Sequence, residues 1–116
     1  MAPKFGMAPQ MEARFARGDL ECEQTGVSLQ RLAPSERGPF GHRHGEQEEI
    51  YVVVGGSGRM KAGDDIVDLR TWDAIRVAPE TIRAFEAGPD GLELLAFGAP
   101  TTDNRDAELL HGWWSD

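Results

Sequence analysis

The chain has 116 residues, enough for one domain with its own core and too few for two ordinary domains. Its formal net charge of −8 at pH 7 disfavours nucleic-acid partners and anionic membrane surfaces, because both are bound through clustered Lys and Arg. The single cysteine, Cys22, excludes an intramolecular disulfide. No apolar run has the length of a signal peptide core or of a membrane span, so we expect a cytoplasmic protein.

Residues 1–25 are expected to form an N-terminal arm. Met11 and Phe15 have helical spacing, and Gly18 ends that pattern. A helix of one or two turns and an irregular strand fit these residues equally well.

From Val27 onward, short apolar clusters alternate with Gly, Pro and Asp, a pattern typical of short strands joined by tight turns. About eight strands are predicted, at residues 27–34, 42–44, 48–54, 59–62, 66–69, 73–78, 82–87 and 92–98. The predicted turns include GGSG at 55–58, GDD at 63–65 and GPDG at 88–91. With no helix between the strands, we expect an all-β fold, an antiparallel barrel or jelly roll over residues 26–100.

The predicted strand at residues 48–54 is apolar on both faces. Alternation separates two sets of side chains, Glu49, Tyr51 and Val53 on one face and Ile50, Val52 and Val54 on the other. A strand of a small barrel that is apolar on its outer side needs a cover. A second subunit packing sheet to sheet is the simplest cover, which predicts a homodimer.

The C-terminal tail, residues 101–116, is polar until Trp113 and Trp114. Two adjacent large aromatic rings at the end of a polar segment are expected to be buried against something. We therefore expect the tail to pack on the barrel or on a neighbouring subunit.

Two histidines one residue apart, His42 and His44, come shortly before Glu49. Residues i and i+2 of a strand point the same way, so both imidazoles can reach one point inside a barrel, and Glu49 arrives on the next strand. Two neutral histidines and one carboxylate form a facial triad with open positions for substrate or dioxygen. Iron, manganese, nickel, cobalt and zinc all accept these ligands. If the register slipped by one residue, Glu48 would replace Glu49.

This segment resembles the first signature motif of the cupin superfamily: H-x-H, four residues, Glu49, six residues and Gly56. The segment WDAIRVAPETIRAF, residues 72–85, is similar to the second cupin motif and matches it at Asp73, Pro79 and Phe85. The resemblance covers residues 27–98. It implies a small single-domain cupin of the type-2 conserved barrel, with a double-stranded β-helix that holds the site. It also implies metal-dependent oxygenases and isomerases as candidate activities.

The second motif departs from its usual form at three positions. Trp72 stands in place of the first Gly, Glu80 in place of the inner Gly, and Arg83 in place of the histidine that usually supplies a fourth metal ligand. Arginine stays protonated, cannot ligate a metal and repels a divalent cation.

Three arrangements of Arg83 are open. It can pair with Glu49 in a bidentate bond, which leaves a metal-free pocket. It can bind the carboxylate or phosphate of a substrate beside a metal with three protein ligands. It can also turn out to solvent and leave a weak triad.

Two functions therefore stay open, and no catalytic residue is assigned. In the first, His42, His44 and Glu49 hold a divalent first-row metal. Arg83 or Tyr51 then binds and orients a small acidic substrate. In the second, the barrel is a binding module that captures a sugar or a carboxylate through Arg83 and the histidines, without metal and without turnover.

Overall fold

The computed structural model describes residues 4–8, 11–38, 41–99, 107–110 and 113–114. These residues form nine strands: β1 Lys4–Ala8, β2 Met11–Phe15, β3 Gly26–Leu32, β4 Gly41–His44, β5 Glu49–Ala62, β6 Asp65–Arg70, β7 Ala74–Val77, β8 Arg83–Gly98 and β9 Ala107–Leu110. No helix capable of spanning a bilayer is present in this part of the chain.

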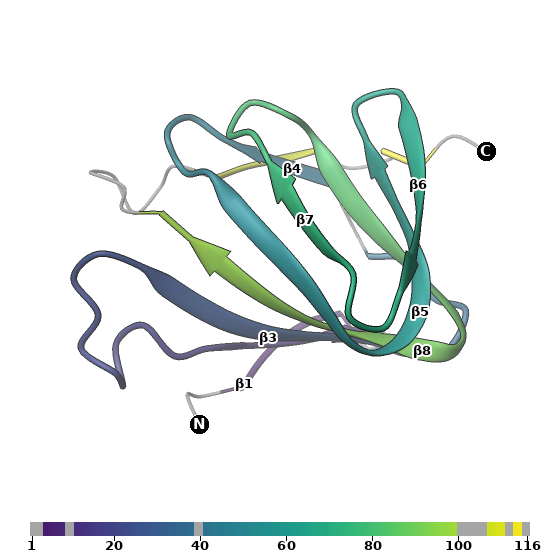
Figure 1. Ribbon diagram of the computed structural model, residues 1–116, viewed down its shortest axis with the longest axis horizontal. Helices are drawn as coiled ribbons and strands as arrows, with labels where there is room; N and C mark the ends of the chain where they lie inside the picture. The colour runs from purple at the N-terminus through teal and green to yellow at the C-terminus, as the bar shows by residue number, and fades with distance from the viewer. Residues whose placement is uncertain (1–3, 9–10, 39–40, 100–106, 111–112, 115–116) are drawn as a thin grey trace.

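All strand pairs are antiparallel, and one continuous sheet curls into two halves that enclose the core (Figure 1). The long strands β5 and β8 run side by side through both halves. The first half has the order β1-β2-β3-β8-β5-β7. The second half joins β9, β4, β8, β5 and β6. The predicted all-β jelly roll is confirmed.

Two of the predicted turns are wrong, because residues 55–58 and 88–91 lie inside β5 and β8. Each strand bends there from one half of the barrel to the other, and the register of β5 against β8 shifts at this point. Gly56 and Gly91 have φ of 69° and 84°, values that favour glycine. A Cβ on Gly56 would lie 2.0 Å from the Gly91 carbonyl oxygen. The glycines thus allow two bent strands to approach closely. The GDD hairpin between β5 and β6 is present as predicted.

The core lies between the two halves of the barrel. The exposure of side chains on β5 confirms the predicted alternation of inward and outward residues after Glu49. Tyr51 and Val53 are each 1% exposed, whereas Ile50 on the opposite face is 43% exposed. The buried cluster comprises Leu32, Tyr51, Val53, Met60, Leu69, Val77, Phe85, Ala87, Leu92, Leu94 and Ala96.

In the N-terminal arm, Met11 and Phe15 lie on a strand, β2, which was one of the two expected outcomes, and residues 16–25 form a loop. All of β2 pairs with β3, from Met11 opposite Leu32 to Phe15 opposite Ser28. Ala13 is buried, and Met11 packs against the core cluster. This segment therefore widens the first half of the sheet.

Near the C-terminus, Trp113 packs against the second half of the barrel. Lys61 donates from Nζ to the Trp113 carbonyl oxygen at 2.8 Å and lies 4.4 Å from its ring centroid. A Cβ on Gly41 would lie 2.7 Å from the ring, so glycine permits this contact beside β4. The tail residues between Leu110 and Trp113 and before β9 are outside the described residues.

Trp114 is held between two arginines on the same outer surface. The guanidinium carbons of Arg37 and Arg59 lie 4.7 and 5.3 Å from its ring centroid. Glu86 on β8 accepts a hydrogen bond from each arginine, through separate carboxylate oxygens. One carboxylate thus positions both cations around the indole ring.

Glu86→Gln tests this cluster through the pH dependence of stability. Hydrogen bonding from Arg59, opposed by burial and assisted by Arg37, lowers the pKa of Glu86. A lowered folded-state pKa stabilises the fold above the unfolded pKa, and that contribution is lost as the pH falls through the folded pKa. We expect Glu86→Gln to lower the free energy of unfolding by about 1 kcal/mol at pH 7, measured by urea denaturation. The difference should shrink under acid conditions.

The matched control is Glu108→Gln, which removes the carboxylate of the exposed Arg43–Glu108 pair. Because both side chains of that pair are largely solvated, its loss should change stability by less than about 0.5 kcal/mol at any pH. A Glu86→Gln deficit that stays constant down to pH 3 would contradict the proposed charge effect.

Candidate functional site

A single carboxylate oxygen, Glu49 Oε1, lies at the centre of the predicted site. Tyr51 donates its hydroxyl to this oxygen at 2.5 Å, and Arg83 Nη2 donates to it at 2.7 Å. The Nε2 atoms of His44 and His42 lie 3.1 and 3.4 Å from the same oxygen. The structure therefore brings together all five residues that the sequence predicted for the site.

Strand pairing explains why these residues meet. His42 lies opposite Arg83 where β4 pairs with β8, and His44 points to the same side as His42. Glu49 begins β5, and Tyr51 follows two residues later on the same face. The Pro79 carbonyl, in the loop before β8, accepts from the His44 backbone N–H at 2.7 Å and from Arg83 Nη1 at 3.1 Å. The loop thus ties β4 to the arginine.

Arg83 is fully buried, with 0% exposure, so the solvent-facing arrangement is wrong. Its Nη1 donates to the Thr81 carbonyl at 2.7 Å as well as to Pro79, and its Nε donates to the Tyr51 hydroxyl at 3.3 Å. The pairing with Glu49 was one of the three open arrangements. It uses one carboxylate oxygen instead of the bidentate geometry, because the other guanidinium nitrogens have different partners.

The hydrogen bonds keep Glu49 anionic despite its burial. Burial by itself raises the pKa of Glu49, but hydrogen bonds from His42, His44 and Tyr51 outweigh it and bring the pKa well below its ordinary value. Burial and the nearby Glu49 charge raise the pKa of Tyr51. The Tyr51 hydroxyl therefore stays protonated and serves as a donor.

His42, His44 and Glu49 form a group that can hold a metal ion, since each offers a ligand atom and all three atoms lie within 4.8 Å of one another. Bonds of about 2.1 Å at angles of about 90–110° place two ligand atoms about 3.0–3.4 Å apart. The measured separations of 3.1 and 3.4 Å between the histidine nitrogens and Oε1 fall in this range. The two separations from Oε1 thus suit a metal ion, and the donor set suits a divalent first-row ion in its chemistry.

Arg83 opposes a metal ion without removing the ligand set. Its positive charge lies 2.7 Å from Oε1, and two positive groups sharing one carboxylate repel each other. No described group donates to the second oxygen of Glu49, Oε2, which is therefore available as a ligand atom. The charge of Arg83 therefore opposes a cation at this point, and the three candidate ligand residues stay grouped beside it.

A pocket of about 200 Å³ opens in front of the histidines and Glu49. Its other walls come from β2, β3, β9 and the loop before β5, and the lining residues are Met11, Ala13, Phe15, Ser28, Gln30, His42, His44, Gln47, Glu49, Ala107 and Leu109. The sequence analysis did not assign the residues from these other walls to the site. Strand alternation was the available sequence signal for these residues, because it indicates which side chains point inward. It does not indicate which strands become neighbours.

Arg83 and Tyr51, predicted as substrate-binding residues, are not among the residues that line this pocket. Both lie behind the Glu49 carboxylate and are at most 1% exposed. Their described contacts support Glu49 from the core side. The substrate-binding role of Arg83 and Tyr51 stays a prediction, and in this arrangement both contact Glu49 instead of the pocket.

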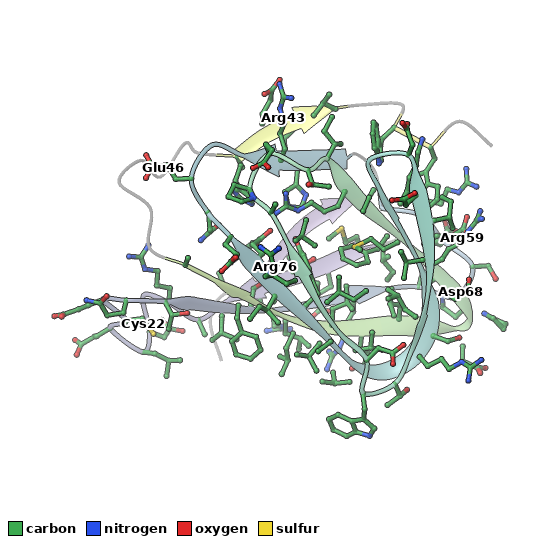
Figure 2. All side chains as sticks on the ribbon, turned by 45° about the horizontal axis from the view of Figure 1, so that its top comes forward. Cys22, Arg43, Glu46, Arg59, Asp68 and Arg76 are labelled. Carbon is green, nitrogen blue, oxygen red and sulfur yellow. The ribbon has the colours of Figure 1, made fainter. Side chains whose placement is uncertain are left out.

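Two other residues considered in the sequence lie away from the site. Glu48 pairs with Arg76 at 2.8 Å on the outer surface, so the register places Glu49 inside, as predicted. In Figure 2, Cys22 lies in the loop between β2 and β3, far from Arg43 on β4. The cysteine is thus remote from the strand that carries the histidines.

No protein-family profile matches the sequence. Among curated proteins, the uncharacterized protein MJ1618 of Methanocaldococcus jannaschii is 30% identical over 70 residues. The match spans 60% of this chain and 56% of that protein, about half of its length.

Solved structures show the fold more clearly. A cupin protein, BF4112 from Bacteroides fragilis, has a TM-score of 0.73 at 24% identity and covers 88% of this chain and 86% of its own. Streptomyces PAC13, solved with uridine, has a TM-score of 0.78 at 15% identity, with coverage of 95% and 85%. Oxalate decarboxylase from B. subtilis has a TM-score of 0.81 at 19% identity, over 94% of this chain and 30% of its own. At these identities the likeness establishes the fold.

Arg83→Met tests whether the buried pair stabilises the fold. The substitution leaves a largely buried carboxylate without its cationic partner, so we expect the free energy of unfolding to fall by about 3 kcal/mol. Adding Glu49→Gln removes the uncompensated charge and should restore most of that loss. Urea denaturation measures both variants. Arg43→Met, which breaks an exposed ion pair, is the control and should cost less than about 1 kcal/mol. Equal stability of the single and double variants would contradict a coupled pair.

Proposed function

We propose that this small cupin-fold protein binds a small molecule in the pocket in front of Glu49, with a divalent first-row metal ion held by His42, His44 and Glu49 at the inner end. We also propose that the working unit is a pair of such chains. The observation that carries the proposal is that three potential ligand atoms lie within 4.8 Å of one another on residues that line a pocket.

The pocket lining indicates a ligand with one polar end. Met11, Phe15 and Leu109 supply apolar surface, whereas Ser28, Gln30 and Gln47 supply hydroxyl and amide groups. A volume of about 200 Å³ suits a molecule smaller than a typical drug. No Lys or Arg is among the lining residues, so the described walls offer a carboxylate no fixed cation.

The metal would decide which chemical class is bound. When present, it supplies Lewis acidity and a positive charge for an acidic ligand, with open coordination positions for substrate or dioxygen. Arg83 and Tyr51 hold Glu49 anionic and fix its orientation from behind. Metal-dependent oxygenase or isomerase activity belongs to this form of the proposal. Oxalate decarboxylase, named for an acidic substrate, has the same fold.

A metal-free binding module is the second candidate, favoured by the Arg83–Glu49 contact. The pair already balances the Glu49 charge, and an Nε2–H on each histidine would donate to the carboxylate at the observed distances. The pocket would then present imidazole, amide and hydroxyl groups, which suit a neutral hydroxylated molecule such as a sugar. PAC13, solved with the hydroxylated molecule uridine, has the same fold.

Metal titration separates the two candidates. We expect Mn²⁺ and Zn²⁺ to bind near one equivalent per chain to protein made without a histidine tag, as measured by calorimetry. Arg83→His replaces the opposing charge with a ligand and should tighten metal binding at least about tenfold. His42→Ala with His44→Ala is the control and should abolish binding.

Tight binding by Arg83→His together with no binding by the natural chain would establish the metal-free candidate. If neither protein bound metal, the three-ligand site itself would be wrong. Thermal denaturation of each variant is the control that distinguishes a loss of metal binding from unfolding.

Leu109→Trp tests the pocket independently of the metal. The indole ring is larger than the leucine side chain and should fill the space in front of the histidines, which weakens ligand binding at least about tenfold. Because Leu109 is half exposed, the substitution should cause no large loss of stability. The probes are oxalate for the metal-bound form, and uridine and glucose for the metal-free form, each titrated by calorimetry. Val67→Trp on the remote strand β6 is the control. A ligand whose affinity is the same in both variants would bind elsewhere.

A further inference from the structure

The outer side of the first half of the sheet carries a continuous apolar surface. Its residues alternate with core residues on β3, β8 and β5, and cross-strand pairing joins them into two rows. Ile50 is 43% exposed and Phe97 is 38% exposed. This outer apolar face consists of Val27, Phe97 and Ile50 in one row and Leu29, Leu95 and Val52 in the next.

Ion pairs surround the outer apolar face on three sides. Their donor–acceptor distances are 2.6, 3.2 and 2.8 Å, and the pairs are Arg14–Glu12 on β2, Arg31–Glu93 across β3 and β8, and Arg76–Glu48 beside β5. Three positive and three negative groups give this rim no net charge, although the whole chain carries −8. Two identical chains therefore repel each other less at this face than an average surface of the chain would predict.

The two halves of the barrel differ in how their outer surfaces are covered. On the second half, Trp113 and Trp114 of the same chain pack over Lys61 and Arg59. No described segment of the chain packs in this way over Ile50 and Phe97, which keep more than a third of their surface exposed.

Trp72, in the turn between β6 and β7, is an exposed aromatic residue whose backbone adjoins β5. It is 76% exposed and has φ of 75°, a conformation that costs any residue with a Cβ. The backbone N–H of Trp72 donates to the carbonyl oxygen of Val53, next to Val52, at 2.7 Å. The turn thus has the geometry of glycine but carries tryptophan, which is the second-motif departure noted in the sequence. A strained residue that buries little of its own surface in the fold indicates a role in contact with another molecule.

We propose that the outer apolar face is the surface through which two copies of this chain associate, with Trp72 as an aromatic anchor at its edge. The inference rests on the pairing proposed above and identifies its surface. An apolar centre with a polar rim of balanced charge is the usual anatomy of such an interface, and aromatic residues supply a large share of its binding energy. A two-fold axis through the face would bring the rim of one copy against the identical rim of the other, and neither rim carries a net charge.

Sedimentation velocity of the full chain, without metal or ligand, tests the surface. The wild type is expected to sediment as a dimer, and Ile50→Glu should raise the dissociation constant at least about tenfold. Ile66→Glu is the matched control, because Ile66 on β6 is 45% exposed but lies outside the face. It should leave the dimer intact.

The outcomes separate the surface from the pairing and from the pocket. A wild type that stays monomeric at every concentration would overturn both the pairing and its surface, and would leave the ligand proposal untouched. A dimer equally stable in Ile50→Glu and Ile66→Glu would overturn the surface alone.

Trp72→Gly tests the anchor. Glycine relieves the backbone strain, so in the Ile50→Glu background it should raise the urea midpoint of the monomer. In the otherwise wild-type chain it should weaken association at least about tenfold, because the ring is lost from the interface. Association unchanged by Trp72→Gly would overturn the role of the ring.

Discussion

The site depends on the need of one buried carboxylate, Glu49, for hydrogen-bond donors. An ionised carboxylate is stable away from water only when charge and hydrogen bonds replace its hydration. Oε1 meets this need through Arg83, Tyr51 and the two histidines. Since these groups come from β4, β5 and β8, one oxygen atom joins three strands. The carbonyl groups of Pro79 and Thr81 then satisfy the remaining demand of the buried guanidinium.

The same interaction governs what the pocket can do. Arg83 stabilises Glu49 as an anion and fixes its position, but its charge also competes with any cation bound on the other side. In the proposed metal-bound form, the arginine that stabilises the fold would therefore weaken metal binding through the shared carboxylate. Because the described pocket walls contain no Lys or Arg, a bound metal would change the preferred ligand from neutral to acidic. The placement of one arginine thus connects core electrostatics to ligand choice.

The path of β5 and β8 connects the site to the outer surfaces. Glycine bends at Gly56 and Gly91 let both strands serve two halves of the barrel. The N-terminal part of β5 carries Glu49 inward and Ile50 outward, so the candidate ligand Glu49 and the outer apolar face lie on opposite sides of one strand. Strand alternation is the physical reason that a change on one side leaves the side chains of the other in place.

The sequence by itself determined the all-β class, since short alternating strands without helices leave a barrel or a jelly roll as the packing. The resemblance to the cupin motifs then favoured the jelly roll. The sequence also predicted that His42, His44 and Glu49 face the barrel interior, because alternation along each of two strands consecutive in the chain points these side chains to one side. Only the tertiary structure decided the direction of Arg83, since a cation goes where partners from other strands accept it. Tertiary packing likewise decided that residues 55–58 and 88–91 are bends within long strands and not turns between strands. It also decided that Met11, Gln30 and Leu109 line one pocket. These outcomes depend on which distant strands become neighbours, and local sequence does not carry that information.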